Sequence, residues 1–171
     1  MTDPTALPNF VGGPPTAAQP DEEQNVPLVD IVRDSLIALG SEPRIDDDGD
    51  VEFEYEGQRL YVRCTEEPMP ALRVFGQWMI DESAPADAEA RLRICADVNA
   101  AYYLIKTAVV GENSDLLLVA CESLLVGGTD VREILSMAVP LTMHGVQVWH
   151  EQATALGGGS TLTDQNPQEQ A

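Results

Sequence analysis

The sequence has few basic residues and few aromatic ones. Nine of its 171 residues are Lys or Arg against 29 Asp and Glu, so the formal net charge is −20, and aromatic residues make up 5% of the chain. Nucleic acid and anionic membrane surfaces would be repelled by a protein of this charge. The acidity itself has two explanations: a generally acidic proteome, or a preference for partner proteins with basic segments.

Groups that bind metals or act as nucleophiles are also scarce. The chain has three cysteines, two histidines (His144 and His150) and one lysine. Zinc sites need ligands at short spacing, whereas Cys64, Cys95 and Cys121 are widely separated and are predicted to be buried free thiols. The sequence contains no GxSxG, GxGxxG or phosphate-loop motif. It therefore predicts a protein that is not an enzyme, with no catalytic residue, metal or cofactor.

The sequence also lacks targeting signals. No apolar run is long enough to cross a bilayer, and the first residues have neither the basic start nor the apolar core of a signal peptide. Together with the unpaired thiols, these absences predict a soluble cytoplasmic protein with reduced cysteines.

Composition divides the chain into three parts. Residues 1–25 are rich in Pro and Gly, with four acids and no base, and are predicted to be a disordered arm, either a recognition arm or a solvated tail. Residues 152–171 are expected to form a flexible polar tail. The tails together carry six acids and no base, so the predicted domain, residues 26–151, holds −14 of the net charge.

The clearest structural pattern lies between residues 46 and 80. Residues 51–55 alternate apolar and acidic side chains, which is typical of a strand with one solvated face. Glu56-Gly57 predicts a tight hairpin turn that places Phe53 opposite Leu60 and Asp50 opposite Arg63. The acidic run 46–50 is interpreted as a turn, because aligning its glycine with a calcium loop puts a base where the first acidic ligand belongs.

Periodicity predicts the remaining elements. Helices are expected at about 27–39, from Ser83 as a possible cap to about Asn99, and from Thr129 onward with a kink rather than a stop at Pro140. Strands are expected at 72–80, 102–110 and 116–125. The last two are apolar on both faces, so a second cover over this part of the sheet is expected. The fold class is α+β, an antiparallel five-stranded sheet with helices packed on it, in the order α-β-β-β-α-β-β-α.

One apolar patch is the candidate binding site. Tyr61, Phe75 and Met79 are predicted to share the outer face of the sheet with arginines. An exposed apolar and aromatic patch often marks a partner surface. The alternative is a face covered by the chain's own helix or tail.

Several segments of the sequence resemble those of a known family. The first helix (PLVDIVRDSLIALG), the acidic turn with its hairpin (DDDGDVEFEYEGQRLYV), the helix ending in DVNAAY and the switch GGTDVREIL resemble the YbjN family of bacterial sensory-transduction regulators, over residues 27–150. That family is similar in fold to type III secretion chaperones. The resemblance implies helices on an antiparallel sheet, a homodimer and a role in binding other proteins. The resemblance assigns no catalytic residues to this sequence.

These observations lead to two hypotheses. The first is a non-enzymatic, chaperone-like or regulatory protein-binding module that acts as a homodimer and binds a protein partner or client through the sheet face or an added strand. The second is a small-ligand binding or sensing domain, which requires a concave pocket with converging polar groups.

Overall fold

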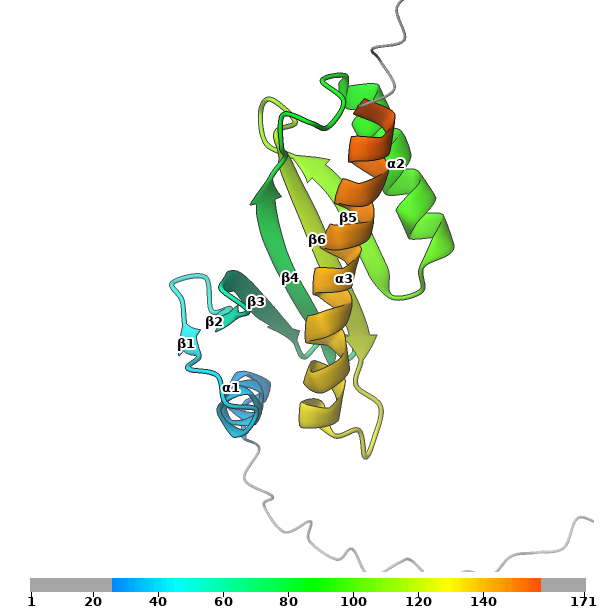
Figure 1. Cartoon of the computed structure of the whole chain (residues 1–171). Helices are drawn as coiled ribbons and strands as arrows, with labels where there is room; N and C mark the ends of the chain where they lie inside the picture. Colours follow the sequence, from blue (N-terminus) through cyan, green and yellow to red (C-terminus); the bar gives the residue numbers. More distant parts are fainter. Residues whose placement is uncertain (1–25, 158–171) are drawn as a thin grey trace, which may run out of the picture.

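The predicted hairpin has the register expected from its sequence. A computed structural model describes residues 26–157 (Figure 1), in which β2 (Val51–Tyr55) pairs antiparallel with β3 (Gln58–Thr65) and places Phe53 opposite Leu60. Glu56 and Gly57 both have positive φ, 51° and 74°, as a two-residue hairpin turn of this kind requires. The preceding run 46–50 forms a turn, as predicted, closed by the Asp46 side chain accepting backbone N–H bonds from Asp48 and Asp50.

The sheet has six strands, so the prediction of five is wrong. The additional strand is β1 (Arg44–Ile45), which pairs antiparallel with β2 across the acidic turn. Its two residues are too few to show an alternating pattern, and this is why the sequence did not reveal it. The other strands are β4 (Ala71–Met79), β5 (Ile105–Val110) and β6 (Leu116–Leu124), in the spatial order β1-β2-β3-β4-β6-β5, all antiparallel.

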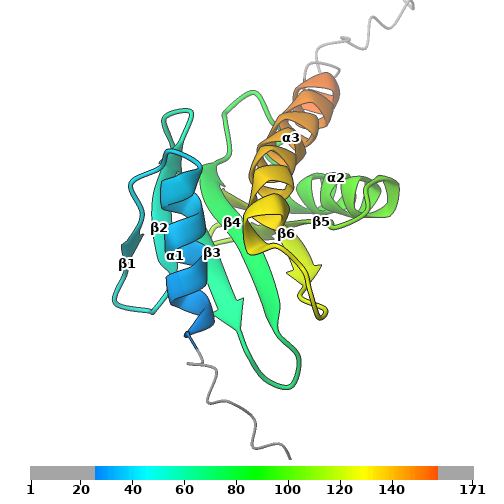
Figure 2. The ribbon, with the colours of Figure 1, turned by 90° about the horizontal axis from the view of Figure 1, so that it is seen from below.

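Three helices pack on one face of this sheet (Figure 2): α1 (Leu28–Ala38), α2 (Ala88–Ala101) and α3 (Val131–Gly157). The α+β class is therefore confirmed. The second helix begins later than expected, because Asp87 rather than Ser83 caps it and accepts the backbone N–H of Ala90 at 3.0 Å. No described helix is long and apolar enough to span a membrane.

The last helix joins two parts of the core. Near its start Leu135 packs with α1 and strands β2 to β4, and near its end Trp149 packs with α2, β5 and β6. Gly145 lets α3 approach the sheet closely, since a Cβ there would lie 2.9 Å from a methyl of Val119. The helix continues through the exposed Pro140 to Gly157, past the domain boundary expected at residue 151. The kink stays a prediction, and the predicted arm and most of the predicted tail lie outside the described residues.

Candidate functional site

The face of the sheet opposite the helices carries no helix within residues 26–157. We call it the open face. Side chains that alternate with the buried ones point to it, and the antiparallel register places them in rows across neighbouring strands. Its members come from all six strands: Arg44, Glu52, Glu54, Arg59, Tyr61, Arg63, Ala71, Arg73, Phe75, Gln77, Met79, Lys106, Ala108, Val110, Leu116, Leu118, Ala120, Glu122 and Leu124.

The basic residues of the chain are concentrated on this face. Five of the nine bases lie there, on β1, β3, β4 and β5, against the three acids of the face and Asp50, which directly precedes β2 and pairs with Arg63. The face is therefore close to neutral on a protein whose formal charge is −20. Anionic or neutral groups meet less repulsion here than elsewhere on the described surface.

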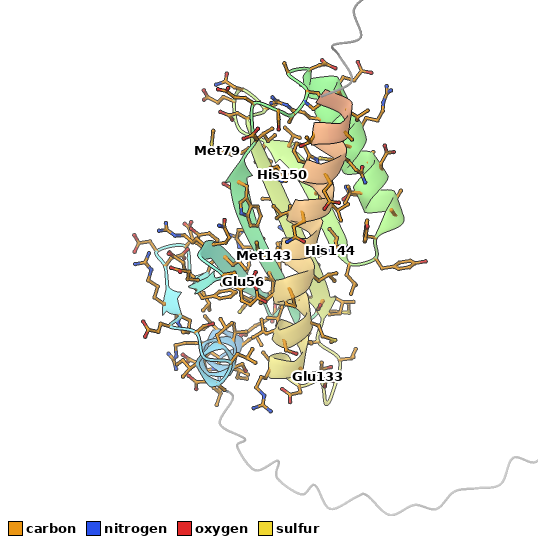
Figure 3. All side chains as sticks on the ribbon, in the orientation of Figure 1. Glu56, Met79, Glu133, Met143, His144 and His150 are labelled. Atoms are coloured by element: carbon orange, nitrogen blue, oxygen red, sulfur yellow. The ribbon has the colours of Figure 1, made fainter. Side chains whose placement is uncertain are left out.

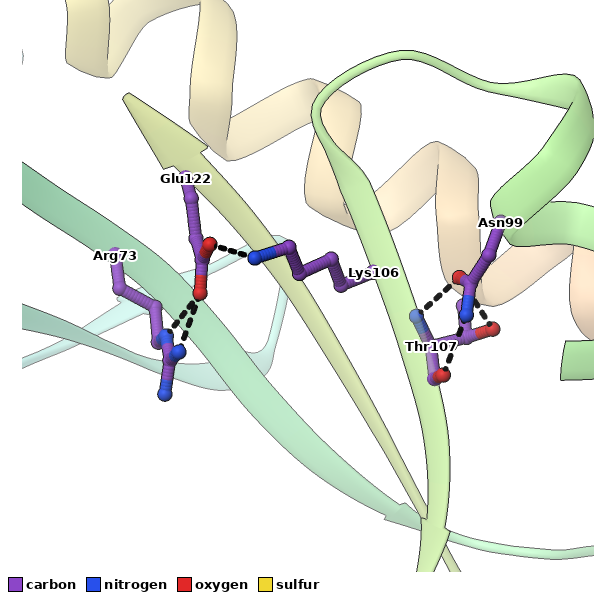
Figure 4. A network of polar contacts seen from close by, with 5 residues as sticks. All are labelled: Arg73, Asn99, Lys106, Thr107 and Glu122. Carbon is purple, nitrogen blue, oxygen red and sulfur yellow. Dashed lines mark hydrogen bonds and ion pairs between the residues drawn. The ribbon is translucent and has the colours of Figure 1, made fainter. Parts of the chain in front are cut away.

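An ion network lies at the centre of the open face (Figure 4). Glu122 on β6 accepts a hydrogen bond from Arg73 Nε on β4 at 2.7 Å and pairs through its other oxygen with Lys106 on β5. The hydrogen bond from Lys106, together with that from Arg73, holds the pKa of Glu122 below its ordinary value, although partial burial acts in the opposite direction. One carboxylate therefore holds two cations in place across three strands.

An aromatic stack lies beside this network. Tyr61 and Phe75 are cross-strand neighbours whose ring centroids are 5.4 Å apart, with the rings stacked at 25°. The Arg63 guanidinium lies 5.5 Å from the centre of the Phe75 ring and makes a bidentate ion pair with the buried carboxylate of Asp50, at 2.9 and 2.6 Å. The stack and its arginine thus have fixed positions.

The structure brings together two of the three predicted site residues. Met79 lies at the far end of β4 (Figure 3), opposite Leu116, and is 68% exposed. It does not join the stack of Tyr61 and Phe75. The sequence did not indicate the central network, because Arg73 and Glu122 are 49 positions apart and meet only through the pairing of β4 with β6.

A groove runs over this part of the open face. A hollow of about 650 Å³ lies between Arg63, Arg73 and Lys106, with apolar walls from Leu104 and Leu124. A second hollow of about 600 Å³ shares the central network and Leu104 with the first and extends along β5 to the end of α2. The groove is therefore basic along its length, with apolar side chains at its sides.

The loop between α2 and β5 borders the groove with apolar side chains. Leu104 has φ = 66°, a conformation that a branched, bulky residue rarely adopts, and its side chain is 59% exposed. The neighbouring Tyr103 is 92% exposed. Strained backbone of this kind tends to occur at functional sites, and here it places an apolar side chain at the groove.

Asn99 hinders strand addition at the free edge of the sheet at β5. Its side-chain amide, at the end of α2, donates to the carbonyl of Thr107 at 3.0 Å and accepts the backbone N–H of Thr107 at 2.7 Å (Figure 4). It thereby occupies the positions at Thr107 that a partner strand would use.

The cysteines and histidines do not form a site in the described part of the chain. No group of three or more His, Cys, Asp or Glu residues between 26 and 157 is arranged to hold a metal ion. Cys95 is buried and accepts a hydrogen bond from the indole of Trp149 at 3.2 Å. Burial raises the pKa of Cys64 to about 11, which leaves its thiol protonated and unreactive at neutral pH.

The sequence profile of a family described as "Putative bacterial sensory transduction regulator", YbjN, matches residues 28–138. The chain belongs to the YbjN family. The match covers the sheet, α1, α2 and the first part of α3. The family is described as regulatory, not as a group of enzymes.

Two solved structures are similar to this chain. One is YbjN from E. coli, described as "a putative transcription regulator", with a TM-score of 0.54 and 14% identity over 76% of this chain and 94% of that one. The other is an uncharacterized protein from Methanothermobacter thermautotrophicus, with a TM-score of 0.49 and 11% identity over 72% of this chain and 97% of that one. No curated protein matches the sequence. The E. coli structure supports the fold of the YbjN family for this chain.

Proposed function

We propose that this YbjN-family protein is a non-enzymatic regulatory module that binds an extended segment of a partner protein across its open face. The observation that carries the proposal is the groove, which combines three cations with the exposed side chains of Leu104 and Leu124. Peptides bind to sheets by adding a strand at an edge or by lying on a surface. Because Asn99 occupies the β5 edge at Thr107 and the opposite edge strand, β1, is only two residues long, the second mode is favoured here.

The charge of the open face selects the kind of segment. Net charge alone favoured partners with basic segments, but the bases gathered on this face favour an acidic or neutral segment with apolar residues between its acids. Double-stranded DNA fits poorly. Its many phosphates would extend beyond this face and meet the strong overall negative charge of the protein.

A small anionic ligand is the second candidate for the groove. The hollow of about 650 Å³ lies within the range of small-molecule sites, roughly 300–1,000 Å³. Such sites bury most of the ligand, whereas this hollow continues along the face into a second one. An elongated occupant therefore fits better.

Homodimerisation stays a prediction of this proposal. Association of two acidic chains costs least where the local charge is near zero, and on the described surface the open face meets that condition. Sedimentation velocity at several protein concentrations, with and without a bound peptide, measures whether a dimer forms and whether the peptide displaces it.

A matched pair of variants tests the binding face. Peptides of about 12 random residues are selected on the full-length protein, and binding is measured to Leu124→Glu, on the open face, and to Leu92→Glu, on α2. The two leucines have similar exposure, 59% and 54%. Loss of one buried leucine contact, about 1.5–3 kcal/mol, predicts at least tenfold weaker binding to Leu124→Glu.

The control variant should bind like the wild type. Equal binding to the wild type and to both variants would place the peptide site elsewhere and remove the proposed function. A selection that enriches basic peptides would show that the net charge of the protein, rather than this face, determines its partners.

A further inference from the structure

The groove leaves apolar side chains in contact with solvent. Leu104 and Leu124, which form its walls, are each 59% exposed, and the adjacent Tyr103 is 92% exposed. Contiguous apolar surface of this kind usually has an occupant, whether a ligand, a partner or another part of the chain. No described residue of this chain covers it.

We infer that residues 1–25 of the same chain occupy the groove and compete with the partner segment. The inference rests on the proposed function, because it assigns the groove to an extended acidic segment. It adds an internal competitor, so that the partner must displace residues 1–25 before it binds.

Residues 1–25 join the domain close to one end of the groove. Val26 and Pro27 lie in a small hollow with Glu66 and Pro70, and the backbone N–H of Leu28 donates to the Glu66 carboxylate at 3.2 Å. Thr65 and Ala71, which flank that loop between β3 and β4, line the groove of the open face. Residues 1–25 therefore enter the domain at the same end of the sheet as the groove.

Residues 1–25 are also long enough to cross the open face. A flexible chain of 25 residues has an end-to-end distance of roughly 25–30 Å. Six strands spaced by about 4.8 Å extend about 24 Å across. Residues 1–25 can thus reach every strand of the open face without being fully extended.

The charge and composition of residues 1–25 suit the groove. They contain four acids, no base and one aromatic residue, Phe10. Three of the acids, Asp21, Glu22 and Glu23, come within five positions of Val26, so in the proposed arrangement they would be the first side chains to meet the cations of the groove. Phe10 lies farther from Val26 along the chain, and its apolar ring is suited to the apolar wall of the groove at Leu104.

Because residues 1–25 are tethered to the domain, a weak interaction is enough for them to occupy the groove. A short flexible tether gives an effective concentration on the order of 1 mM. A segment that binds with a dissociation constant near that value would occupy the groove about half of the time. A partner segment of moderate affinity could then still displace it.

Paramagnetic relaxation on the full-length protein tests the position of residues 1–25. A spin label is attached to Thr16→Cys in a Cys64→Ser background, which leaves the buried Cys95 and Cys121 unlabelled. We expect strong broadening of the amide signals of Lys106 and Leu124 and little at Leu92 on α2. Broadening no stronger at Lys106 and Leu124 than at Leu92 would overturn the inference.

A mixed sample distinguishes contact within one chain from contact between two chains. Isotope-labelled protein without the spin label is combined with spin-labelled protein without the isotope. Broadening in this mixture as strong as in the singly labelled chain would mean that the segment comes from a second copy, which also overturns the inference.

Charge variants connect the segment to partner binding. In the full-length triple variant Asp21→Asn, Glu22→Gln, Glu23→Gln, we expect weaker broadening and up to about twofold tightening of a peptide with the sequence of residues 1–25 added in trans, because a groove that is half occupied by the tethered segment becomes free. The control neutralises three acids outside the open face, Asp97→Asn, Glu112→Gln and Glu151→Gln, and should bind this peptide as the wild type does.

The two proposals fail in different ways. If selected peptides bind the groove but the triple variant binds the 1–25 peptide no more tightly than the wild type, the internal competitor is wrong and the proposed function stands. If the spin label broadens the groove signals but no selected peptide loses affinity for Leu124→Glu, the proposed partner site is wrong.

Discussion

Replacing Asn99 by Ala should open the edge of β5. In the wild type the Asn99 side chain makes two hydrogen bonds to the backbone of Thr107, at 3.0 and 2.7 Å. Each hydrogen bond contributes about 0.5–1.5 kcal/mol, and an exposed site recovers part of that from water. We therefore expect Asn99→Ala to lower the free energy of unfolding by about 1–2 kcal/mol.

Urea denaturation followed by the fluorescence of the two tryptophans, the fully buried Trp149 and the partly buried Trp78, measures this change. The control is Asp97→Ala, which lies two positions earlier on α2 and gains a similar helix propensity. It should change stability by no more than about 0.5 kcal/mol. An exposed edge also promotes pairing between chains, so sedimentation velocity should show concentration-dependent association of Asn99→Ala alone.

The result that would refute this reasoning is an Asn99→Ala protein as stable as the control and no more associated than the wild type. The β5 edge would then be closed by α2 as a whole, or would not be prone to pairing. The argument that partners bind the face because the edge is blocked would lose its support.

Three further predictions concern the core, the central network and the thiols. Gly145→Ala should destabilise the fold by about 1–2 kcal/mol in urea titrations, because the added methyl meets Val119, whereas Gly127→Ala, which has open space around it, should not. Because the pKa of Glu122 is lowered in the folded protein, its carboxylate stabilises the fold at neutral pH and that contribution is lost as the pH falls through the lowered pKa. Glu122→Gln should therefore be about 1 kcal/mol less stable than the wild type at pH 7, with the difference shrinking below about pH 4.3 in denaturation curves. With a pKa of about 11, Cys64 should react slowly with a thiol reagent at pH 7.5 and faster at each higher pH, as followed by absorbance.

The local parts of this fold follow from the sequence, and the hairpin shows why. Its register depends on residues a few positions apart, and the apolar pair of Phe53 and Leu60 agrees with the ion pair of Asp50 and Arg63. A shift by one residue would break both pairs. The helix capped by Asp87 shows the limit, since Ser83 and Asp87 are both suitable caps and packing against β5 and α3 selects the later one.

The candidate site depends on contacts that the sequence does not reveal. Tyr61 and Phe75 were found because they alternate on consecutive strands that form a hairpin. The network of Arg73, Glu122 and Lys106 needs β6 to insert between β4 and β5, and three separate polar residues do not indicate that insertion. The available signal for that insertion was the apolar character of both faces of β6, one of which is part of the open face.

The order in which the chain is synthesised gives the last helix a further consequence. Strands β1 to β6 leave the ribosome before α3, yet Leu135 and Trp149 on α3 fill both parts of the core. Until residue 157 has been made, the sheet has apolar groups uncovered on both of its faces. The nascent protein is therefore most prone to aggregation while α3 is still missing, and folding of the whole domain is expected only after residue 157 has left the ribosome.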